Sequence, residues 1–376
     1  MSNPLQIGVV GCGNIADAYV RHMGKAPEVR VRGVTDLLPE RAGELAQAYG
    51  LQTYEDLEAM LADEAIELVV NLTIHHAHYD VTRRCLEAGR HVYSEKPLAM
   101  TFEQAQDLVA LAKAQGVRLA CAPITFLGEA QQTAWKMIRE GRLGKVRMAY
   151  AEVDWGRIET WHPNPEPFYD VGPLFDVGVY PLTVLTTIFG PARQVTAYGK
   201  MLQPDRVRKD GVPYHISTPD FLLVMVEFET GPVARLTSNF YVSQRTQEAG
   251  IAFHGDEGSL RLGHWFMFDA PVFFAPFGEP YEPVPLLRPA EPGVAWQRGV
   301  VDMAEAIAEG RRQRVTGEQA AHVVEIMCAA HEAVASQRPV SLSSTFTPPQ
   351  PVAWAQDEGQ AKEELEETRE EVVSYE

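Results

Sequence analysis

Apolar residues follow two different patterns along this chain. Up to about residue 123, short apolar runs alternate with stretches in which apolar residues recur every three or four positions. The runs predict buried strands and the stretches predict helices. Strands are expected at Leu5–Val10, Val29–Val34, Ile66–Leu72, His91–Tyr93 and Val117–Cys121. Helices are expected at Ile15–Met23, Pro39–Tyr49, Leu57–Leu61, Tyr79–Ala88 and Thr101–Gln115. This alternation predicts a parallel, doubly wound α/β sheet.

Strand-like runs dominate the second part of the chain, which predicts an α+β domain with a large mixed or antiparallel sheet. The expected strands are Val146–Val153, Gln194–Lys200, Phe221–Glu229, Val233–Phe240, Ile251–His254 and Ser259–Leu262. The expected helices are Gln131–Gly141, Leu174–Phe189, Trp296–Glu309 and Gly317–Ser336. The predicted division is therefore a first domain at 1–123, a second at 124–345, and an acidic, disordered tail at 346–376.

Composition narrows the class of protein. The net charge is −18, and the last twenty residues contribute nine acids and two bases to it. An acidic chain argues against nucleic-acid binding, which needs a basic face. The longest apolar runs are too short to cross a membrane, and no signal peptide precedes the first strand, so a cytoplasmic location is expected. The four cysteines are widely spaced, which is typical of reduced thiols rather than of a disulfide framework or a zinc site.

A glycine-rich turn follows the first predicted strand and opens a helix. Gly11 and Gly13, with Asn14, Ile15 and a small residue at position 16, match the turn that holds a dinucleotide pyrophosphate. Asp36 ends the second strand, where a carboxylate accepts hydrogen bonds from a ribose and repels a 2′-phosphate. The sequence therefore predicts that this first domain is a Rossmann domain that binds NAD in preference to NADP.

Four longer motifs resemble the Gfo/Idh/MocA family of oxidoreductases, which includes inositol dehydrogenases and glucose–fructose oxidoreductase. The resemblance runs from Ile7 to about Leu342 and rests on the segments 71–78 (NLTIHHAH), 89–99 (GRHVYSEKPLA), 141–146 (GRLGKV) and 172–180 (GPLFDVGVY). Ile74 and His75 stand where the family has Pro and Asn. Tyr180 stands where many members have His.

The resemblance implies a set of site residues. Thr73, His78 and Glu95 would lie against the cofactor, and Lys96 would lie near the nicotinamide and the reacting hydroxyl. The residue types support this, because an ammonium group can stabilise a developing alkoxide and lower the pKa of a neighbouring phenol. Tyr180 is the first candidate for the general acid/base, with Asp176 orienting Lys96 or the substrate.

The Pro-rich stretch before Asp176 carries candidate substrate contacts. Trp155, His162 and Tyr169 offer aromatic and imidazole groups of the kind that stack on sugars and bind hydroxyls. His162 is an alternative acid/base, because its ordinary pKa lies near neutrality. A metal site is not expected, since the histidines at 75, 76 and 78 have no carboxylate or cysteine at a fixed spacing.

These features predict an NAD-dependent oxidoreductase that acts on a secondary hydroxyl of a cyclic polyol, a sugar or a sugar derivative. Two alternatives stay open: a glycoside lyase or hydrolase that uses NAD transiently through a 3-keto sugar, and a non-catalytic dinucleotide-binding regulator. The resemblance also implies a homodimer or homotetramer joined through the second domain's sheet.

Overall fold

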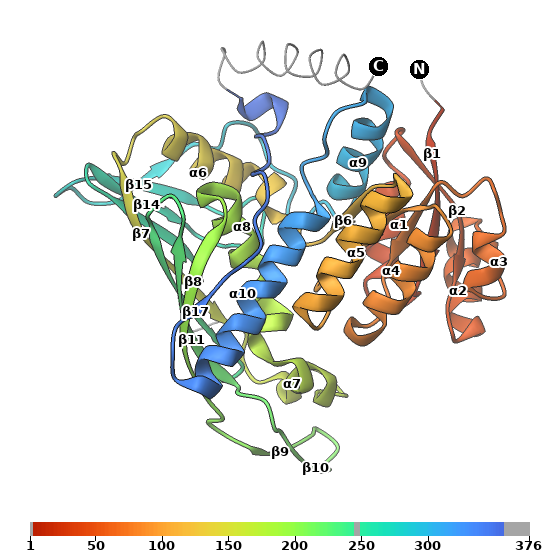
Figure 1. The fold of residues 1–376 in the computed structure, drawn as a ribbon, viewed down its shortest axis with the longest axis horizontal. Helices are drawn as coiled ribbons and strands as arrows, with labels where there is room; N and C mark the ends of the chain where they lie inside the picture. The colour runs from red at the N-terminus through yellow and green to blue at the C-terminus, as the bar shows by residue number, and fades with distance from the viewer. Residues whose placement is uncertain (1–2, 244–248, 357–376) are drawn as a thin grey trace.

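The computed structural model describes residues 3–243 and 249–356, in which two large sheets lie side by side (Figure 1). The first sheet has six strands in the order β3-β2-β1-β4-β5-β6, and every neighbouring pair is parallel. Its strands are β1 (Leu5–Val10), β2 (Val29–Thr35), β3 (Gln52–Thr53), β4 (Leu68–Asn71), β5 (His91–Ser94) and β6 (Leu119–Cys121). The strand order reverses between β1 and β4, which is where ligands bind in sheets of this kind.

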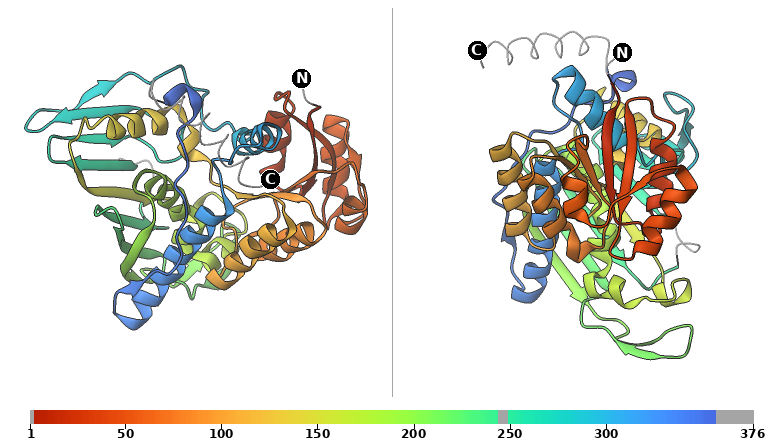
Figure 2. Two further views of the ribbon diagram at one scale, coloured as in Figure 1. Left: turned by 45° about the horizontal axis from the view of Figure 1, so that its top comes forward. Right: turned by 90° about the vertical axis from the view of Figure 1, so that its right-hand side faces the viewer.

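Helices cover both faces of the first sheet (Figure 2). They are α1 (Ala16–Met23), α2 (Pro39–Tyr49), α3 (Leu57–Leu61), α4 (His78–Glu87) and α5 (Phe102–Gln115). Because both faces are covered, the central strands are mostly buried, and all four residues of β4 are buried. Towards the edge of the sheet, β2 exposes Arg30 and Arg32. The predicted doubly wound fold is confirmed, and the short β3 is a strand that the apolar pattern did not reveal.

The second sheet has nine strands in the order β16-β15-β14-β13-β7-β12-β11-β8-β17. Only β7 and β12 pair in parallel; the other neighbours are antiparallel. The strands are β7 (Val146–Asp154), β8 (Ala192–Lys200), β11 (Phe221–Phe228), β12 (Val233–Asn239), β13 (Gly250–Gly255), β14 (Gly258–Leu262), β15 (Val272–Pro276), β16 (Glu282–Val284) and β17 (Val340–Ser341). A separate hairpin consists of β9 (Asp205–Val207) and β10 (Pro213–His215). The predicted large mixed sheet is confirmed.

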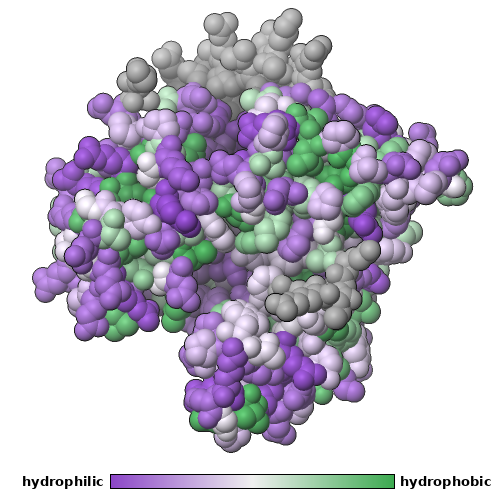
Figure 3. All heavy atoms as spheres, turned by 180° about the vertical axis from the view of Figure 1, so that it is seen from behind, coloured by the Kyte–Doolittle hydropathy of each residue, from purple (hydrophilic) through white to green (hydrophobic). Residues whose placement is uncertain are grey.

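One face of the second sheet packs against helices and the other is open. The covering helices are α6 (Glu129–Arg139), α8 (Val179–Phe189) and α10 (Gly317–Ser336). Along β11, Leu222, Val224 and Val226 are buried against them, whereas Met225 between them is 37% exposed. Seen from behind, polar residues cover most of the molecule, with apolar residues among them (Figure 3). Along β11, side chains therefore alternate between the face that packs on the helices and the open face.

The helix predicted at Leu174–Phe189 has a more complex form. An α-helix, α7 (Glu166–Pro173), bends at Gly172, which has φ +76°, and runs through a π-helical turn at Leu174–Gly178 into α8. The whole span Glu166–Phe189 is long and apolar enough to cross a membrane by length and composition, but 94% of its most apolar window is buried inside the protein. That burial is typical of a core helix.

Two late helices return to the first domain. α9 (Arg298–Glu309) follows the second sheet, and α10 packs against both α5 and β8 (Figure 1). Arg118, just before β6, donates hydrogen bonds to the carbonyl oxygens of Ala306 (3.1 Å) and Arg311 (2.7 Å). The predicted boundary at residue 123 stays a prediction, because the chain joins the two sheets at several places.

The predicted disordered tail is wrong for residues 346–356. Phe346 and Ala355 are buried, the Ala355 carbonyl oxygen accepts a hydrogen bond of 2.6 Å from Arg139, and Arg288 lies 4.1 Å above the Trp354 ring. The apolar residues of this segment pack on the second domain. The prediction of disorder was based on the high charge farther along the sequence, which these apolar residues do not share. Residues 357–376 lie outside the described part of the chain.

Cutting the chain after Pro351 should therefore lower its melting temperature relative to a chain that ends at Gln356. The shorter chain loses the Arg139–Ala355 hydrogen bond and the Arg288–Trp354 contact. Each of these contributes about 1 kcal/mol to the free energy of unfolding. For a domain of this size the expected fall is about 2–6 °C by calorimetry. Equal melting temperatures for the two chains would show that residues 352–356 contribute nothing.

Candidate active site

The glycine turn has the geometry of a dinucleotide-binding turn. Gly11 has φ +93°, and a Cβ there would lie 2.7 Å from the backbone of Leu72, so both conformation and space require glycine. A Cβ on Gly13 would meet nothing within 4 Å, which leaves room for a ligand close to the backbone. Asn14 is exposed and Ile15 half-buried, and no side chain caps the start of α1. The Ala16 amide donates to the Gly13 carbonyl oxygen at 3.0 Å, which closes the turn at the start of α1, where a pyrophosphate would bind.

Asp36 is held beside this turn. Its Oδ2 accepts a hydrogen bond of 2.6 Å from the Cys12 amide, and its Oδ1 accepts one of 2.8 Å from the Leu38 amide. Each carboxylate oxygen has a second lone pair that a ribose hydroxyl could use. The residues present at this end of the sheet therefore fit NAD.

Lys96, Asp176 and Tyr180 meet at the end of β5. Lys96 Nζ lies 2.9 Å from Asp176 Oδ1, also donates to the Asp176 carbonyl oxygen, and lies 5.2 Å from the centre of the Tyr180 ring. The Lys96–Pro97 peptide bond is cis. Asp176 sits on the π-helical turn and Tyr180 in the first turn of α8, so the irregular helix brings both to the first domain.

Burial and neighbouring charges shift the pKa values of both Lys96 and Tyr180. Burial lowers the pKa of Lys96, but Asp176, Tyr180 and Glu95 outweigh it, and the net pKa lies above the ordinary value. Burial raises the pKa of Tyr180; Lys96 lowers it, while Glu95 and Asp176 raise it further. At neutral pH the site therefore holds an ammonium ion beside a protonated phenol.

His78 has a different role from the predicted one. It is 1% exposed, and its two ring nitrogens face backbone carbonyl oxygens, with Nδ1 at 2.7 Å from Pro97 O and Nε2 at 3.0 Å from Thr73 O. A side chain enclosed in this way cannot reach a cofactor. The prediction that His78 binds NAD is corrected: His78 joins the turn after β4 to the loop that carries Lys96.

Thr73 and Glu95 lie near this loop. The Thr73 hydroxyl donates to Asn71 Oδ1 at 2.6 Å, and Thr73 remains partly exposed. Glu95 is buried; Tyr19 donates to its Oε1 at 2.6 Å and the Lys96 amide to its Oε2 at 3.0 Å. Cofactor contact by either residue stays a prediction, and the structure gives Glu95 the additional task of fixing the backbone of Lys96.

Of the three predicted substrate residues, Trp155 lies near Tyr180, whereas His162 lies on a separate loop. The half-buried Trp155 has its ring 6.1 Å from that of Trp265, which in turn contacts Tyr180. His162 is half-buried, packs on Phe168 with 4.8 Å between ring centres, and uses Nδ1 within its own loop. Because His162 makes no contact with Lys96 or Tyr180 in the described part of the chain, the geometry favours Tyr180 as the acid/base.

Tyr169 belongs to a buried structural network. It is 2% exposed; its hydroxyl donates to Glu159 at 2.6 Å and accepts from Arg206 at 2.7 Å, and Arg206 also binds Asp220 at 2.5 Å. The assignment of Tyr169 to substrate binding is corrected, because no face of its hydroxyl is free. The network instead anchors the β9–β10 hairpin to α7.

Several residues near the site escaped the sequence analysis. Phe266 and Trp265 pack against the Tyr180 ring, and Trp296 packs against Phe266. The run Gly263–Asp269 after β14 contains three aromatic residues, which could have signalled a binding loop. The pKa of His75 is lowered to about 4, chiefly by burial and then by Lys96, which places a neutral imidazole within the field of Lys96 and Asp176.

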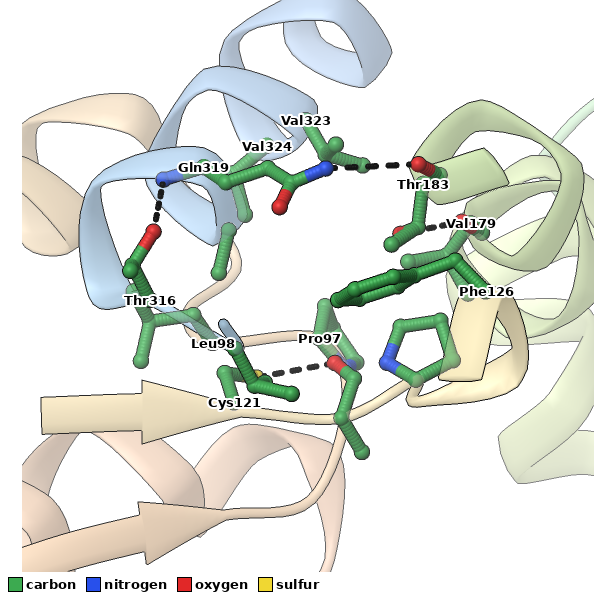
Figure 4. Close-up of a pocket in the computed structure, with 14 residues that line it drawn as sticks. Pro97, Leu98, Cys121, Phe126, Val179, Thr183, Thr316, Gln319, Val323 and Val324 are labelled. Carbon is green, nitrogen blue, oxygen red and sulfur yellow. Dashed lines mark hydrogen bonds between the residues drawn. The ribbon is translucent and has the colours of Figure 1, made fainter. Parts of the chain in front are cut away.

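Figure 4 shows a small pocket beside Pro97, lined by residues of both domains. Most of its lining is apolar, including Leu98, Phe126 and Val324. Gln319 spans its rim, with its amide nitrogen 3.3 Å from the Thr183 carbonyl oxygen. A sugar would find few polar partners here, so the pocket belongs to the packing that supports Lys96. In residues 3–243 and 249–356, no three His, Cys, Asp or Glu side chains are placed to hold a metal ion.

Comparison with known proteins agrees with this geometry. Residues 5–122 match the model of an oxidoreductase family with an NAD-binding Rossmann fold, and residues 131–261 match the GFO/IDH/MocA C-terminal domain. The chain is 31% identical to dTDP-3,4-didehydro-2,6-dideoxy-alpha-D-glucose 3-reductase of Streptomyces antibioticus, over 70% of this chain and 76% of the relative. It is 26% identical to D-glucoside 3-dehydrogenase of Escherichia coli (strain K12), over 69% and 78%.

The solved structure of levoglucosan dehydrogenase with NADH and levoglucosan has the same fold. Its TM-score is 0.80 at 21% identity, with 91% of this chain and all of the other covered. The chain has an NAD-binding domain and is an oxidoreductase of sugars or polyols. Its family is established by both matched domains and by the identity to the reductase: the chain belongs to the GFO/IDH/MocA oxidoreductases.

Proposed function

We propose that the protein is an NAD-dependent dehydrogenase or reductase that interconverts a secondary hydroxyl and a ketone on the ring of a sugar or cyclic polyol. The observation that carries this proposal is the group of Lys96, Asp176 and Tyr180, in which Lys96 Nζ lies 2.9 Å from a carboxylate oxygen and 5.2 Å from the phenol ring. An ammonium ion and a phenol side by side can bind one substrate oxygen and exchange a proton with it.

The chain's own residues would handle the substrate oxygen and its proton. Bound NAD supplies the hydride chemistry. During reduction, Tyr180 donates its proton to the carbonyl oxygen while Lys96 stabilises the developing negative charge. During oxidation the phenolate of Tyr180 takes the hydroxyl proton. Asp176 keeps Lys96 charged and directed at the same oxygen, because its carboxylate raises the pKa of that ammonium group. The raised pKa of Tyr180 favours its acid form, which suits reduction.

A panel of substrates tests this function. Inositols, aldoses and glycosides would be offered with NAD, and the corresponding ketones with NADH, while absorbance of NADH is followed at neutral and alkaline pH. Formation or loss of NADH with at least one ring substrate supports the proposal. Tight NADH binding with no turnover in either direction would favour a regulator instead.

The cofactor preference can be tested at Asp36. Asp36→Ala should narrow the ratio of NADP(H) to NAD(H) dissociation constants about tenfold, because a carboxylate beside the 2′-position repels a phosphate and the substitution removes that repulsion. Calorimetry with both reduced cofactors measures the ratio. Glu40→Ala, an exposed acid at the start of α2, is the matched control. Equal affinities in the unsubstituted protein would contradict the expectation.

A transient 3-keto route remains the second candidate. The similarity to a D-glucoside 3-dehydrogenase favours glycosides as substrates. In a lyase or hydrolase of this type, NAD would be regenerated and the aglycone released. Release of aglycone without net NADH formation distinguishes this route from simple oxidation.

We also propose that the enzyme is a cytoplasmic homodimer or homotetramer. The open face of the second sheet presents a continuous set of large side chains that are 37–57% exposed: Met148, Tyr150, Tyr198 and Met225. Neighbouring strands place these residues on one face, and a second copy of the sheet would cover them. The oligomeric state in solution tests this.

A further inference from the structure

Aromatic side chains pack against the Tyr180 ring. The Tyr180 ring centre lies 5.4 Å from that of Trp265 and 5.0 Å from that of Phe266. Phe266 packs on Trp296 at 5.7 Å, and Trp265 packs on Trp155 at 6.1 Å. We call Trp155, Trp265, Phe266 and Trp296 the aromatic wall. It is built from three loops, after β7, after β14 and before α9.

The aromatic wall is both rigid and accessible. Trp265 is 2% exposed and donates from Nε1 to the Glu152 carbonyl oxygen at 3.0 Å, so it forms the fixed back of the wall. Trp296 lies against both Tyr19, at 5.6 Å, and Phe266. Trp155, Phe266 and Trp296 are half-buried, like Tyr180 itself. The wall therefore presents fixed apolar surface next to the group that would carry out the reaction.

The charges near Tyr180 disfavour an anionic substrate. Among the described residues, the charged side chains that act on the pKa of Tyr180 are Lys96, Glu95 and Asp176, which are two acidic residues and one basic residue. Lys96 is already engaged with Asp176. His75 does not restore the balance, because its lowered pKa leaves it neutral at pH 7. A phosphate or carboxylate close to the reacting carbon would be repelled by this field.

We propose that the substrate is a neutral ring whose apolar C–H face stacks on the aromatic wall, with no phosphate, carboxylate or nucleotide near the reacting carbon. The proposal rests on the function proposed above and narrows its substrate class. A pyranose or cyclic polyol presents hydroxyls at its edge and C–H groups on its face. The wall would take the face while Lys96 and Tyr180 take one edge hydroxyl.

The test compares neutral and anionic rings on the full-length protein. Methyl and phenyl glucosides and myo-inositol are set against glucose 6-phosphate, glucuronate and a nucleotide-linked glucose. The neutral rings should have kcat/KM at least tenfold above their anionic counterparts. In parallel, calorimetry measures binding of the same rings to the NADH complex, so that affinity is known where turnover is absent.

Variants of Phe266, a residue of the aromatic wall, provide the second part of the test. Phe266→Ala should raise KM for neutral rings about three- to tenfold, with kcat and the NADH dissociation constant little changed, because the lost stacking acts on the ring and not on the proton transfer. Phe266→Leu, which keeps apolar volume, should give a smaller rise and guards against misfolding of the alanine variant. Phe277→Ala, at a hairpin tip that is 82% exposed, should change nothing.

The outcomes separate this inference from the proposed function. Neutral rings that bind but are not turned over would support the aromatic wall as a ring site and overturn the proposed function. Turnover with anionic rings preferred, or an unchanged KM in a folded Phe266→Ala variant, would overturn the inference and leave the function intact. Absence of both binding and turnover for every neutral ring would overturn both.

Discussion

Replacing Lys96 with methionine should lower turnover by about two to four powers of ten, the usual loss when a positioned oxyanion donor or acid/base partner is removed. The expected size follows from how closely Lys96 is held: its ammonium lies 2.9 Å from Asp176 Oδ1 and 5.2 Å from the Tyr180 ring. Methionine keeps the length and apolar stem but cannot bind the substrate oxygen. Steady-state kinetics in both directions measure the loss.

Lys113→Met, on the exposed surface of α5, is the matched control and should keep full activity. The NADH dissociation constant of Lys96→Met, followed by fluorescence, should change little. If Lys96→Met kept more than a tenth of the turnover of the unsubstituted enzyme, Lys96 would not contribute to the chemical step.

Tyr180→Phe should cause a comparable loss and should also change the pH profile. Oxidation needs the phenolate, and because the pKa of Tyr180 is raised, the phenolate fraction is small at pH 7 and increases with pH. Oxidation by the unsubstituted enzyme should therefore speed up from pH 7 to pH 10, while reduction stays level because the phenol form still predominates over this range. The residual activity of Tyr180→Phe should lack this dependence.

The double variant tests whether the two residues act as one unit. Lys96→Met with Tyr180→Phe should be little worse than either single change, because groups that share one proton transfer are not additive. Multiplied losses would mean that they act on separate steps. Near-full activity in Tyr180→Phe, together with an inactive His162→Ala, would transfer the acid/base role to the loop histidine.

The sequence predicted those parts of the fold that depend on local pattern. The parallel strands are short apolar runs because both faces of their sheet are covered, and Gly11 is required by its own backbone conformation and the closeness of Leu72. Lys96 and Asp176 lie 80 residues apart, and nothing in the local sequence specifies their ion pair. Only the family resemblance predicted that they would lie together.

Other residues were misassigned because their partners lie far along the chain. His78 is enclosed by the Pro97 carbonyl oxygen, and Tyr169 is held by Arg206 from the β9–β10 hairpin. A histidine or tyrosine in an active-site motif does not reveal whether backbone or substrate will use its polar atoms. Residues 346–356 were predicted to be disordered from the charge that follows them, although Phe346 and Trp354 supply apolar surface.

The return of the late helices to the first domain has a consequence for folding. Arg118 and the Leu119 carbonyl oxygen, at the last strand of the first sheet, hydrogen-bond to Ala306, Arg311 and Gln313, and α10 packs against α5 and β8 together. A fragment that ends after β6 would expose these groups and one side of α5. The two domains should therefore melt in a single cooperative transition, and neither is expected to survive proteolytic separation as an independent folding unit.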